Sequence, residues 1–416
     1  MRLLYTLSIS LYSLAIRLVS VKNQKAKLWV DGRKNWKQGL KNAMKNNTKP
    51  VVWVHCSSLG EFEQGRPVIE SIKEKSDNLF ILLTFFSPSG YEIRKKYAHA
   101  DYVCYLPSDT ITNSINFVTI ANPTVALFVK YEFWYNYLKV LKNRDIPVWL
   151  ISGIFRPSHH FFKWWGFWFR KQLNCFDHFF LQNQASAQLL DRINIKNYTI
   201  GGDTRFDRVI EVAKSGKEIE IAKTFKNNKF TIVAGSTWQA DEDILTRYIN
   251  ESDNDFKYII APHEIDKEHV QQIVSKISKK TIKYSEVNTN TDLLSAKVLI
   301  IDNIGMLSTL YRYADLVMIG GGFGKGIHNI LEPAVFGIPI IIGPNYQKFN
   351  EAVELVKRET VFTIKSYNEF SELVNNLSGD KVRLKKIFET QNQYIKAMSG
   401  STTIIVNKLL SITETL

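Results

Sequence analysis

The chain has 416 residues, of which 45% are hydrophobic and 12% aromatic. This apolar content excludes a disordered chain and is enough for two or three folded domains. The formal net charge is +14, but residues 1–50 carry eleven basic side chains against one acid, Asp31, so that segment alone holds +10. The rest of the chain is nearly balanced, which argues against nucleic-acid binding and indicates one basic terminal region.

Residues 1–21 predict a helix with an apolar row at helical spacing, formed by Leu4, Leu7, Leu11, Leu14 and Leu18. Arg17 and several serines interrupt the apolar centre and no A-x-A site follows, so the segment is a poor signal peptide. It fits a helix lying in the membrane interface or a single span, with an amphipathic helix docked on its own domain as the alternative. In either membrane arrangement the basic residues 22–49 stay cytoplasmic, beside anionic lipid.

Short runs rich in Val and Ile alternate with helical stretches along almost the whole chain. Such runs are typical of strands buried on both faces of a parallel sheet, and the intervals between them indicate βαβ units. The first series of expected strands is Val51–His55, Phe80–Phe85, Val125–Tyr131, Val148–Ser152, His178–Gln182 and Tyr198–Gly201. The second series is Phe230–Gly235, Lys257–Pro262, Thr281–Ser285, Lys297–Ile301, Leu316–Gly320 and Pro339–Gly343.

The two series are separated near GGDTRFDR, residues 201–208, whose glycines suit a linker. We therefore expect an α/β protein with two Rossmann-like domains facing one another across a cleft. Ligands would bind at the carboxyl ends of the strands.

The stretch HCSSLGEFEQGRP, residues 55–67, leaves the first expected strand through small residues and places Glu61 at the start of a helix. A strand followed by small residues and a helix start is a place where ligands meet backbone N–H groups. A capped helix with an acidic first turn is the alternative, because the helix dipole alone favours a carboxylate there.

The three cysteines, Cys56, Cys104 and Cys175, are widely spaced and form no C-x-x-C pair. They fit a reducing compartment and predict neither a structural disulfide nor a zinc site. The scattered histidines add no ligand spacing, so we expect no structural metal.

Residues 161–171, FFKWWGFWFRK, concentrate seven aromatic side chains among basic ones. A helix that is aromatic on nearly every face cannot bury all of them against one sheet, and Trp with basic neighbours is typical of an interface-seeking helix. The segment therefore predicts a second membrane contact, with a large inter-domain core as the alternative.

Residues 318–344 place five glycines directly after an expected strand, followed by His328, Asn329 and Glu332 at the start of a short helix. Glycines let the backbone approach phosphate, the helix start offers N–H donors, and Glu332 is well placed for ribose hydroxyls. A glycine-rich turn with a structural glutamate is the alternative. The acids at 241–243 resemble a metal motif, but we interpret them as the first turn of a helix.

Six segments in this order resemble one family: HCSSLGEFEQGRPVIE, KYEFWYN, SGIFRPSHHFF, GGDTRFD, AGSTWQADED and GGGFGKGIHNILEPAVFGIPIIIGP. They are similar to the 3-deoxy-D-manno-octulosonic acid (Kdo) transferases of lipopolysaccharide synthesis. The resemblance implies a GT-B glycosyltransferase that uses CMP-Kdo at the cytoplasmic face of the bacterial inner membrane, with a lipid A precursor as acceptor and no cofactor.

With that resemblance, the expected domains are a membrane-anchoring helix (1–21), an acceptor-binding Rossmann-like domain (22–203), a CMP-sugar-binding Rossmann-like domain (204–390) and a C-terminal helix (391–416) that packs back on the acceptor domain. The resemblance also implies roles for particular residues. Glu61 would be the catalytic base, and Glu132 and Arg205 would stabilise the transition state. The CMP contacts would be Pro262, His263, Ile304, Gly305, Met306, Asn329, Ile330, Leu331 and Glu332. Further contacts to the donor would come from Ser58, Gly60, Ser236, Gly322 and His328.

The chain departs from the family pattern at four places. Arg205 stands where the family usually has Lys, and AGSTW replaces AGSTH. A P-R-H triplet is shortened to Pro262–His263, and Ile327 replaces a glycine. These changes affect the expected phosphate and cytosine contacts. We expect inverting, in-line displacement of CMP; the alternatives are another GT-B enzyme such as a UDP-sugar 2-epimerase, or a non-catalytic membrane-bound nucleotide-sugar binder.

Overall fold

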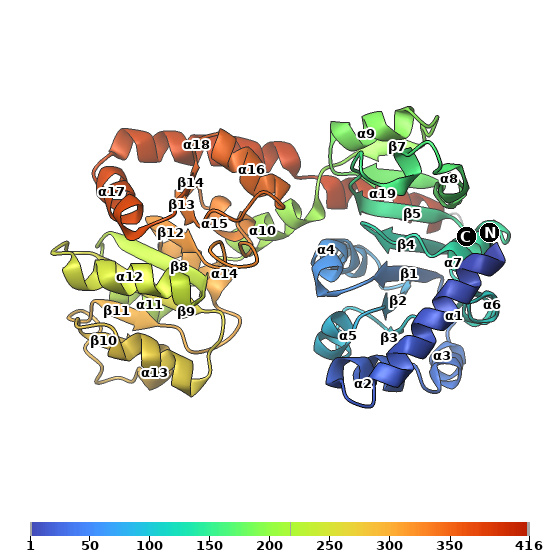
Figure 1. The fold of residues 1–416 in the computed structure, drawn as a ribbon, viewed down its shortest axis with the longest axis horizontal. Coiled ribbons are helices and arrows are strands. Elements are labelled where there is room, and N and C mark those ends of the chain that lie inside the picture. Colours follow the sequence, from blue (N-terminus) through green and yellow to red (C-terminus); the bar gives the residue numbers. More distant parts are fainter. Residues whose placement is uncertain (1, 217, 414–416) are drawn as a thin grey trace. The chain divides into compact units, whose positions relative to one another are not determined.

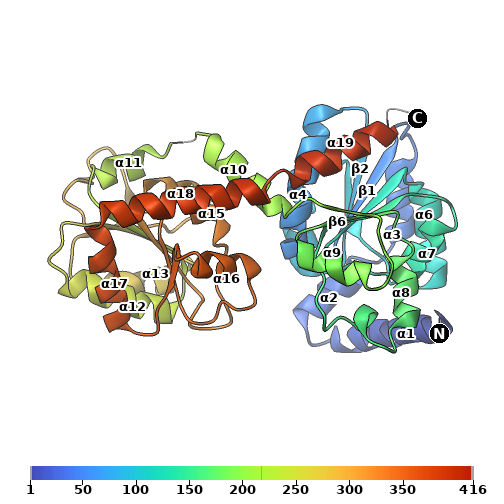
Figure 2. The same ribbon diagram turned by 90° about the horizontal axis from the view of Figure 1, so that it is seen from above.

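The computed structural model describes residues 2–216 and 218–413 and contains two compact units (Figures 1 and 2). The first unit comprises Met1–Asp207 and Met398–Leu416, and the second comprises Arg208–Ala397. The expected domain limits, 203/204 and 390/391, stay predictions of where independently folding parts begin.

The first unit is built on a seven-stranded sheet in the order β3-β2-β1-β4-β5-β6-β7. All neighbouring strands are parallel. The strands are β1 Val51–Cys56, β2 Phe80–Phe85, β3 Tyr102–Tyr105, β4 Val125–Val129, β5 Val148–Gly153, β6 His178–Leu181 and β7 Tyr198–Ile200.

Helices cover both faces of this sheet, as parallel strands require, since each crossover connection places a helix on one face (Figure 1). They are α1 Arg2–Val19, α2 Gln24–Asp31, α3 Trp36–Met44, α4 Leu59–Lys75, α5 Pro88–Arg94, α6 Ile111–Ala121, α7 Tyr135–Lys142, α8 Phe167–Leu173, α9 Gln184–Asp191, the first turn of α10 Thr204–Lys214, and α19 Ser401–Thr413.

Alternate residues of one strand enter opposite cores. Val51 and Trp53 of β1 pack on one side of the sheet, whereas Val52 and Val54 pack on the other. The second core also takes in Ile405 from α19, which lies beside α4 (Figure 2). The last helix of the chain thus helps to hold the helix that begins beside Glu61.

The second unit contains another seven-stranded parallel sheet, in the order β10-β11-β9-β8-β12-β13-β14. Its strands are β8 Thr231–Thr237, β9 Lys257–Pro262, β10 Thr281–Lys283, β11 Val298–Ile300, β12 Leu316–Ile319, β13 Ile340–Ile342 and β14 Val361–Thr363. Its helices are α11 Glu220–Lys226, α12 Gln239–Glu251, α13 Lys267–Ser275, α14 Leu307–Leu310, α15 Leu331–Ala334, α16 Asn350–Lys357, α17 Tyr367–Ser378 and α18 Lys381–Met398.

The twelve strands expected from the sequence are present, with ends that differ by at most two residues. Two edge strands, β3 and β14, were not predicted. The prediction of a single helix over residues 161–171 was wrong. A short 3-10 turn, His160–Phe162, is followed by a non-helical stretch and then by α8.

Both sheets change direction of strand order at one point, where ligands bind in open α/β sheets. In the first unit this point lies between β1 and β4, and in the second between β8 and β12. Glu61 follows β1 and Glu132 follows β4, while Ser236 is the penultimate residue of β8 and the glycine-rich loop follows β12. The topology therefore brings the predicted site residues to the expected edge of each sheet.

Candidate active site

Glu61 lies in the first turn of α4, at the positive end of the helix dipole. Ser58 caps this helix: its hydroxyl oxygen accepts from the Gly60 N–H at 3.2 Å, and its O–H donates to Glu61 Oε2. Glu61 is only partly buried. The two interpretations of this stretch therefore coexist, because the helix is capped and its carboxylate still reaches solvent.

Glu132 lies at the neighbouring strand end and is 6% exposed. Its Oε2 accepts from the Trp134 indole N–H at 2.6 Å and lies 3.3 Å from His55 Nε2. On the opposite side of the imidazole, His55 Nδ1 is 2.9 Å from the Thr84 hydroxyl. Trp53 Nε1 also donates to that hydroxyl, at 2.8 Å. The Glu132 carboxylate is thus fixed by a polar network that joins β1, β2 and the loop after β4.

The two carboxylates share an environment with the buried thiol of Cys56. Burial raises the pKa of Cys56 well above its usual value, and the charges of Glu61, Glu132 and Glu63 raise it further. Cys56 is fully buried and lies at the end of β1. Glu61 follows β1 and Glu132 follows the neighbouring parallel strand β4, so the two carboxylates lie at the same end of the sheet.

Tyr131 marks the positive side of this site. Burial raises the pKa of its hydroxyl, Arg156 and Arg205 oppose that rise, and Glu61 adds to it. Both guanidinium groups and the Glu61 carboxylate therefore act on a single phenol. Arg156 is exposed, follows β5 at the same sheet edge, and was not predicted as a site residue.

Arg205 lies in the first turn of α10 and is held by Asp203, the residue before that helix. Its Nε and one terminal nitrogen donate to Asp203 Oδ2 at 3.0 and 2.8 Å. Asp203 is 2% exposed. A guanidinium fixed by a buried carboxylate is pre-oriented, which reduces the entropy lost when it meets an anion.

In the second unit, Asp241 ties two predicted loops together. Its Oδ2 accepts from the Trp238 N–H and from the Gly321 N–H, both at 2.9 Å. Asp241 is fully buried and lies with Glu242 in the first turn of α12, as interpreted from the sequence, while Asp243 lies just beyond that turn. Burial raises its pKa, and the two N–H groups oppose that rise. Asp241 thus fixes the loop after β12 to the end of β8.

Three rings stack at this sheet edge: Trp238, His263 and His328. The Trp238 and His263 ring centres are 4.6 Å apart, and those of His263 and His328 are 4.5 Å apart. Trp238 Nε1 also donates to His328 Nε2 at 3.0 Å. Burial, and then the charge of His263, lowers the pKa of His328, so a neutral imidazole accepts this bond at pH 7. The tryptophan that departs from the family pattern is therefore part of a ring stack with two predicted site residues.

The remaining predicted CMP contacts differ in which of their groups are accessible to a ligand. Asn329 Oδ1 accepts from the Leu331 N–H at 3.1 Å, and Asn329 Nδ2 donates to Glu332 Oε1 at 2.9 Å. The side chains of Ile330 and Leu331 are buried, so only their backbone could meet a ligand. The third segment lies before α14 and comprises Ile304, Gly305 and Met306, with Ile304 87% exposed.

The strand ends in this unit are held by close backbone approach. A Cβ on Gly322 would lie 2.6 Å from Gly343 N, so this glycine is required by the packing of two loops. Ser236 has φ +52°, an uncommon conformation for a serine. Pro262 ends the buried strand β9, and the following His263 N–H donates to Thr237 O at 2.9 Å.

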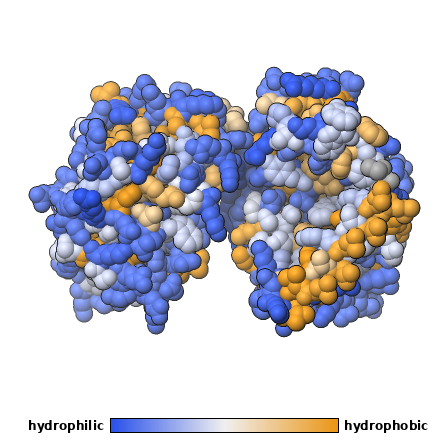
Figure 3. All heavy atoms as spheres, viewed as in Figure 1, coloured by the Kyte–Doolittle hydropathy of each residue, from blue (hydrophilic) through white to orange (hydrophobic). Residues whose placement is uncertain are grey.

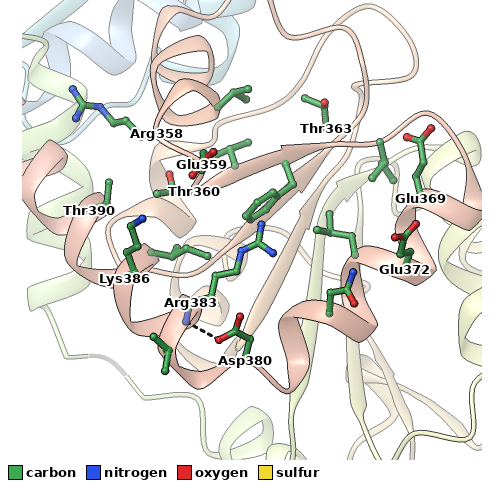
Figure 4. A pocket seen from close by; sticks show the side chains of 18 residues that line it. Arg358, Glu359, Thr360, Thr363, Glu369, Glu372, Asp380, Arg383, Lys386 and Thr390 are labelled. Atoms are coloured by element: carbon green, nitrogen blue, oxygen red, sulfur yellow. Dashed lines mark hydrogen bonds between the residues drawn. The ribbon is translucent and has the colours of Figure 1, made fainter.

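A cavity of about 880 Å³ lies elsewhere in the second unit, among β14, α17 and α18 (Figure 4). Its walls carry charges of both signs, including Arg358, Arg383 and Glu372, and none of the predicted site residues. Size therefore does not identify the site in this unit.

The first unit also presents an apolar surface. By length and composition, α1 alone among the described helices could cross a membrane. Its polar side faces its own unit: Tyr5 donates to Asp109 at 2.7 Å and Arg2 to Asn136 at 3.0 Å. The opposite side forms an exposed strip (Figure 3). We call this strip the leucine face; it comprises Leu3, Leu4, Leu7, Leu11, Leu14 and Leu18.

The aromatic segment is divided between core and surface. Phe161 and Trp168 are buried, and Trp168 stacks on Tyr135 with ring centres 5.0 Å apart. Three side chains of the segment are exposed instead: Trp164 at 91%, Trp165 at 46% and Phe167 at 66%. Trp168 also lies 6.1 Å from the Tyr5 ring of α1, so this segment adjoins the N-terminal part of that helix.

Comparisons with known proteins agree on a family and a fold. Residues 34–208 match the family described as 3-Deoxy-D-manno-octulosonic-acid transferase (kdotransferase). The chain is 26% identical over 361 residues to the 3-deoxy-D-manno-octulosonic acid transferase of Aquifex aeolicus, which covers 84% of this chain and 90% of that relative.

Two solved structures share the fold. The UDP-GlcNAc 2-epimerase from Neisseria meningitidis has a TM-score of 0.60 at 15% identity, covering 87% of this chain and 100% of the other. MurG from Acinetobacter baumannii has a TM-score of 0.56 at 9% identity, covering 87% and 99%. The expected α/β, GT-B-like fold with two Rossmann-like sheets is thereby confirmed.

Proposed function

The chain is a glycosyltransferase of the Kdo transferase family, and on that premise we propose that it moves Kdo from CMP-Kdo to a hydroxyl of a lipid A precursor at the cytoplasmic face of the bacterial inner membrane. The observation that carries this proposal is the placement of Glu61, Glu132 and Arg205. All three lie within the residues that match the family: Glu61 and Glu132 follow the neighbouring strands β1 and β4, and Arg205 lies in the first turn of α10.

Glu61 is the proposed general base. The acceptor oxygen attacks the anomeric carbon of Kdo, the bond from that carbon to the phosphate oxygen breaks, and CMP leaves with the electron pair. The acceptor proton passes to Glu61, a transfer that contributes typically ~10²–10⁴-fold. Attack opposite the leaving group inverts the anomeric centre. The Ser58 hydroxyl donates to Oε2, and among the described side chains no hydrogen bond is made to Oε1, which leaves that oxygen to the acceptor.

Positive charge on the same unit would meet the acidic sugar. Arg156 and Arg205 lie around Tyr131, and a guanidinium is a permanently charged, planar donor for carboxylate or phosphate. The N-terminus of α4 adds backbone N–H donors for an anion. Glu132, whose carboxylate is held by the Trp134 N–H, is proposed to stabilise the transition state.

The CMP moiety would bind to the second unit at the switch between β8 and β12. The proposed contacts include the Trp238–His263–His328 stack and the loop that Asp241 holds at Gly321. Stacked aromatic rings suit a nucleobase, and glycine backbone suits phosphate. No protein-bound metal or other cofactor is required by this scheme.

The leucine face and the exposed aromatic side chains would hold the enzyme at the bilayer. A helix that docks through polar side chains and exposes leucines is suited to lying in the membrane interface. The basic residues 22–49 follow it directly, and each cation near anionic lipid contributes about 1 kcal/mol.

The test is incubation of the purified protein with CMP-Kdo and a lipid A precursor, followed by mass spectrometry to count the sugars added. Glu61→Gln should bind CMP-Kdo and transfer nothing measurable, while Glu63→Gln, two positions along the same helix, should remain active. Turnover by Glu61→Gln close to that of the native enzyme would remove Glu61 from its role. Epimerisation of UDP-GlcNAc without Kdo transfer would favour the 2-epimerase alternative.

A further inference from the structure

A cavity of about 230 Å³ lies in the first unit between α1 and the edge of the sheet. Ile9, Tyr12 and Ser13 of α1 form one wall. The other wall is aromatic, with Trp29 of α2 and with Phe86 and Trp134 from the loops after β2 and β4. An apolar cavity of about 150 Å³ takes up benzene, so this volume is sufficient for part of a hydrocarbon chain.

The walls of the cavity are made mainly of carbon. The Phe86 ring stacks with Tyr12 at 6.4 Å and tilts against Trp134 at 4.7 Å. Asp109 borders the cavity, but its carboxylate already accepts from Tyr5 and from the backbone N–H groups of Asn136 and Tyr137. A hydrocarbon is therefore the ligand chemistry that fits.

The cavity adjoins the proposed reaction centre. The Trp134 ring that forms its wall donates its N–H to Glu132 at 2.6 Å. The N–H of Phe86 donates to Ser57 O at 3.2 Å, one residue before the cap of the Glu61 helix. A chain seated in the cavity would hold its polar head at the sheet edge that carries both carboxylates.

One cationic group, Arg33, adjoins the same cavity. The Arg33 guanidinium lies 3.8 Å from the Trp29 ring centre and donates to the carbonyl oxygens of Trp29, Phe86 and Leu106. Among the described residues it is paired with no carboxylate, so its charge is not neutralised locally. Burial lowers its pKa to about 9, which leaves it cationic at pH 7.

We propose that this cavity is a subsite for a fatty-acyl chain of the lipid acceptor, which seats the acceptor hydroxyl near Glu61 and Glu132. The inference rests on the proposed function and adds to it how the acceptor is recognised. The apolar walls fit an acyl chain, and the positive charge of Arg33 behind the Trp29 ring favours a nearby anionic headgroup over a neutral lipid. The contact of the cavity wall with Glu132 favours it over lipid of the surrounding bilayer.

The first experiment fills the cavity from α1. Ser13→Trp places a large ring in it, whereas Ser10→Trp adds the same ring to the exposed side of the helix and serves as the control. Ser13→Ala removes the 2.9 Å hydrogen bond to Ser108 without filling the space. Each variant is assayed in detergent micelles with the acylated, bisphosphorylated acceptor and with the same acceptor after removal of its acyl chains.

Ser13→Trp should raise KM for the acylated acceptor about tenfold or more relative to both controls, with no change in kcat/KM for the deacylated acceptor. An equal loss on both acceptors, or no loss on either, would overturn the subsite. Thermal unfolding and circular dichroism of all three variants serve as the check that each is folded.

A second experiment needs no turnover. An acceptor with a diazirine at the end of one acyl chain is irradiated with the native protein, and the cross-linked peptides are identified by mass spectrometry. Labelling should concentrate on peptides that contain Tyr12 or Phe86, and it should fall in Ser13→Trp. Equal labelling by a phosphatidylethanolamine with the same diazirine would assign the cavity to bilayer lipid and overturn the proposal. Failure of the proposed function would appear differently, as an absence of Kdo transfer to either acceptor by the native enzyme.

Discussion

The indole nitrogen of Trp134 lies 2.6 Å from the Glu132 carboxylate, and the two side chains come from one loop after β4. The same nitrogen is 3.0 Å from His55 Nε2, so the indole N–H connects the carboxylate to a buried imidazole. Trp134 is thus a positioning residue whose ring also forms the wall of the apolar cavity.

Replacing Trp134 by Phe should reduce kcat while leaving KM for CMP-Kdo nearly unchanged. A hydrogen bond to a charged group is worth about 1.5–3 kcal/mol, which corresponds to about 10- to 100-fold in rate. Trp53→Phe is the matched control, since Trp53 donates to Thr84 in the same network without touching Glu132. That variant should lose stability and keep its kcat. A similar loss of kcat in both variants would contradict a positioning role for Trp134.

Asp241 is expected to control donor binding in the second unit. Asp241→Ala removes the acceptor for two backbone N–H groups and frees the loop at Gly321. The dissociation constant for CMP, measured by calorimetry, should rise about tenfold, since lost hydrogen bonds to a charged group cost about 1.5–3 kcal/mol each and part of this is spent in reordering the loop. Asp243→Ala, on the same helix turn but paired with Lys276 at the surface, should leave CMP binding unchanged.

Asp109 should make the stability of the first unit depend on pH. Burial raises its pKa from 3.8 to about 6, so the folded protein binds a proton there more tightly than the unfolded chain does. The stabilising contribution is complete below pH 3.8 and is lost as the pH rises to about 6, which amounts to about 3 kcal/mol.

The measurement is denaturant unfolding of the native protein and of Asp109→Asn at several pH values between about 3.5 and 7. As the pH rises over that range, the free energy of unfolding of the native protein should fall by about 3 kcal/mol relative to that of Asp109→Asn. Curves that stay parallel would show that Asp109 does not titrate in this way.

Three exposed aromatic side chains should contribute to membrane binding. Replacing Trp164, Trp165 and Phe167 together by Ser should raise the vesicle dissociation constant roughly tenfold or more, since burying one large apolar side chain is worth about 1.5–3 kcal/mol. Trp168→Ser is the contrasting variant, because Trp168 is already buried against Tyr135 and its loss should lower the unfolding temperature instead. Unchanged sedimentation of the triple variant with anionic vesicles would show that these side chains do not contribute to membrane binding.

Most of the fold could be predicted because the strands of a parallel sheet are buried on both faces. The runs around Val54 and Ile341 therefore read as continuous apolar segments. The strands β3 and β14 lie at sheet edges, are short, and have partly exposed residues in their burial patterns. Edge strands of this kind carry a weak apolar signal. The other two edge strands, β7 and β10, are equally short and partly exposed but were predicted, so edge position alone does not explain the two omissions.

The candidate site was predicted in part. Glu61, Glu132 and His263 lie where strand ends predict them, since position after a strand is readable from the sequence. The partners that hold them were not predicted: His55 meets Trp134 across 79 positions, and Asp241 meets Gly321 across 80. Such contacts depend on strand order, which local patterns do not specify. Arg156 could have been found, because it follows β5 at the edge shared with Glu132.

The return of α19 to the first unit has a consequence for how the protein is made. Ile405, Val406 and Leu409 complete the core that supports α4, yet they are translated only after the whole second unit. During synthesis, α4 therefore lacks its packing against α19 until the second unit has been translated, whereas the leucines of α1 have already emerged from the ribosome. Early capture of the nascent chain by the bilayer would shield the leucine face during that interval.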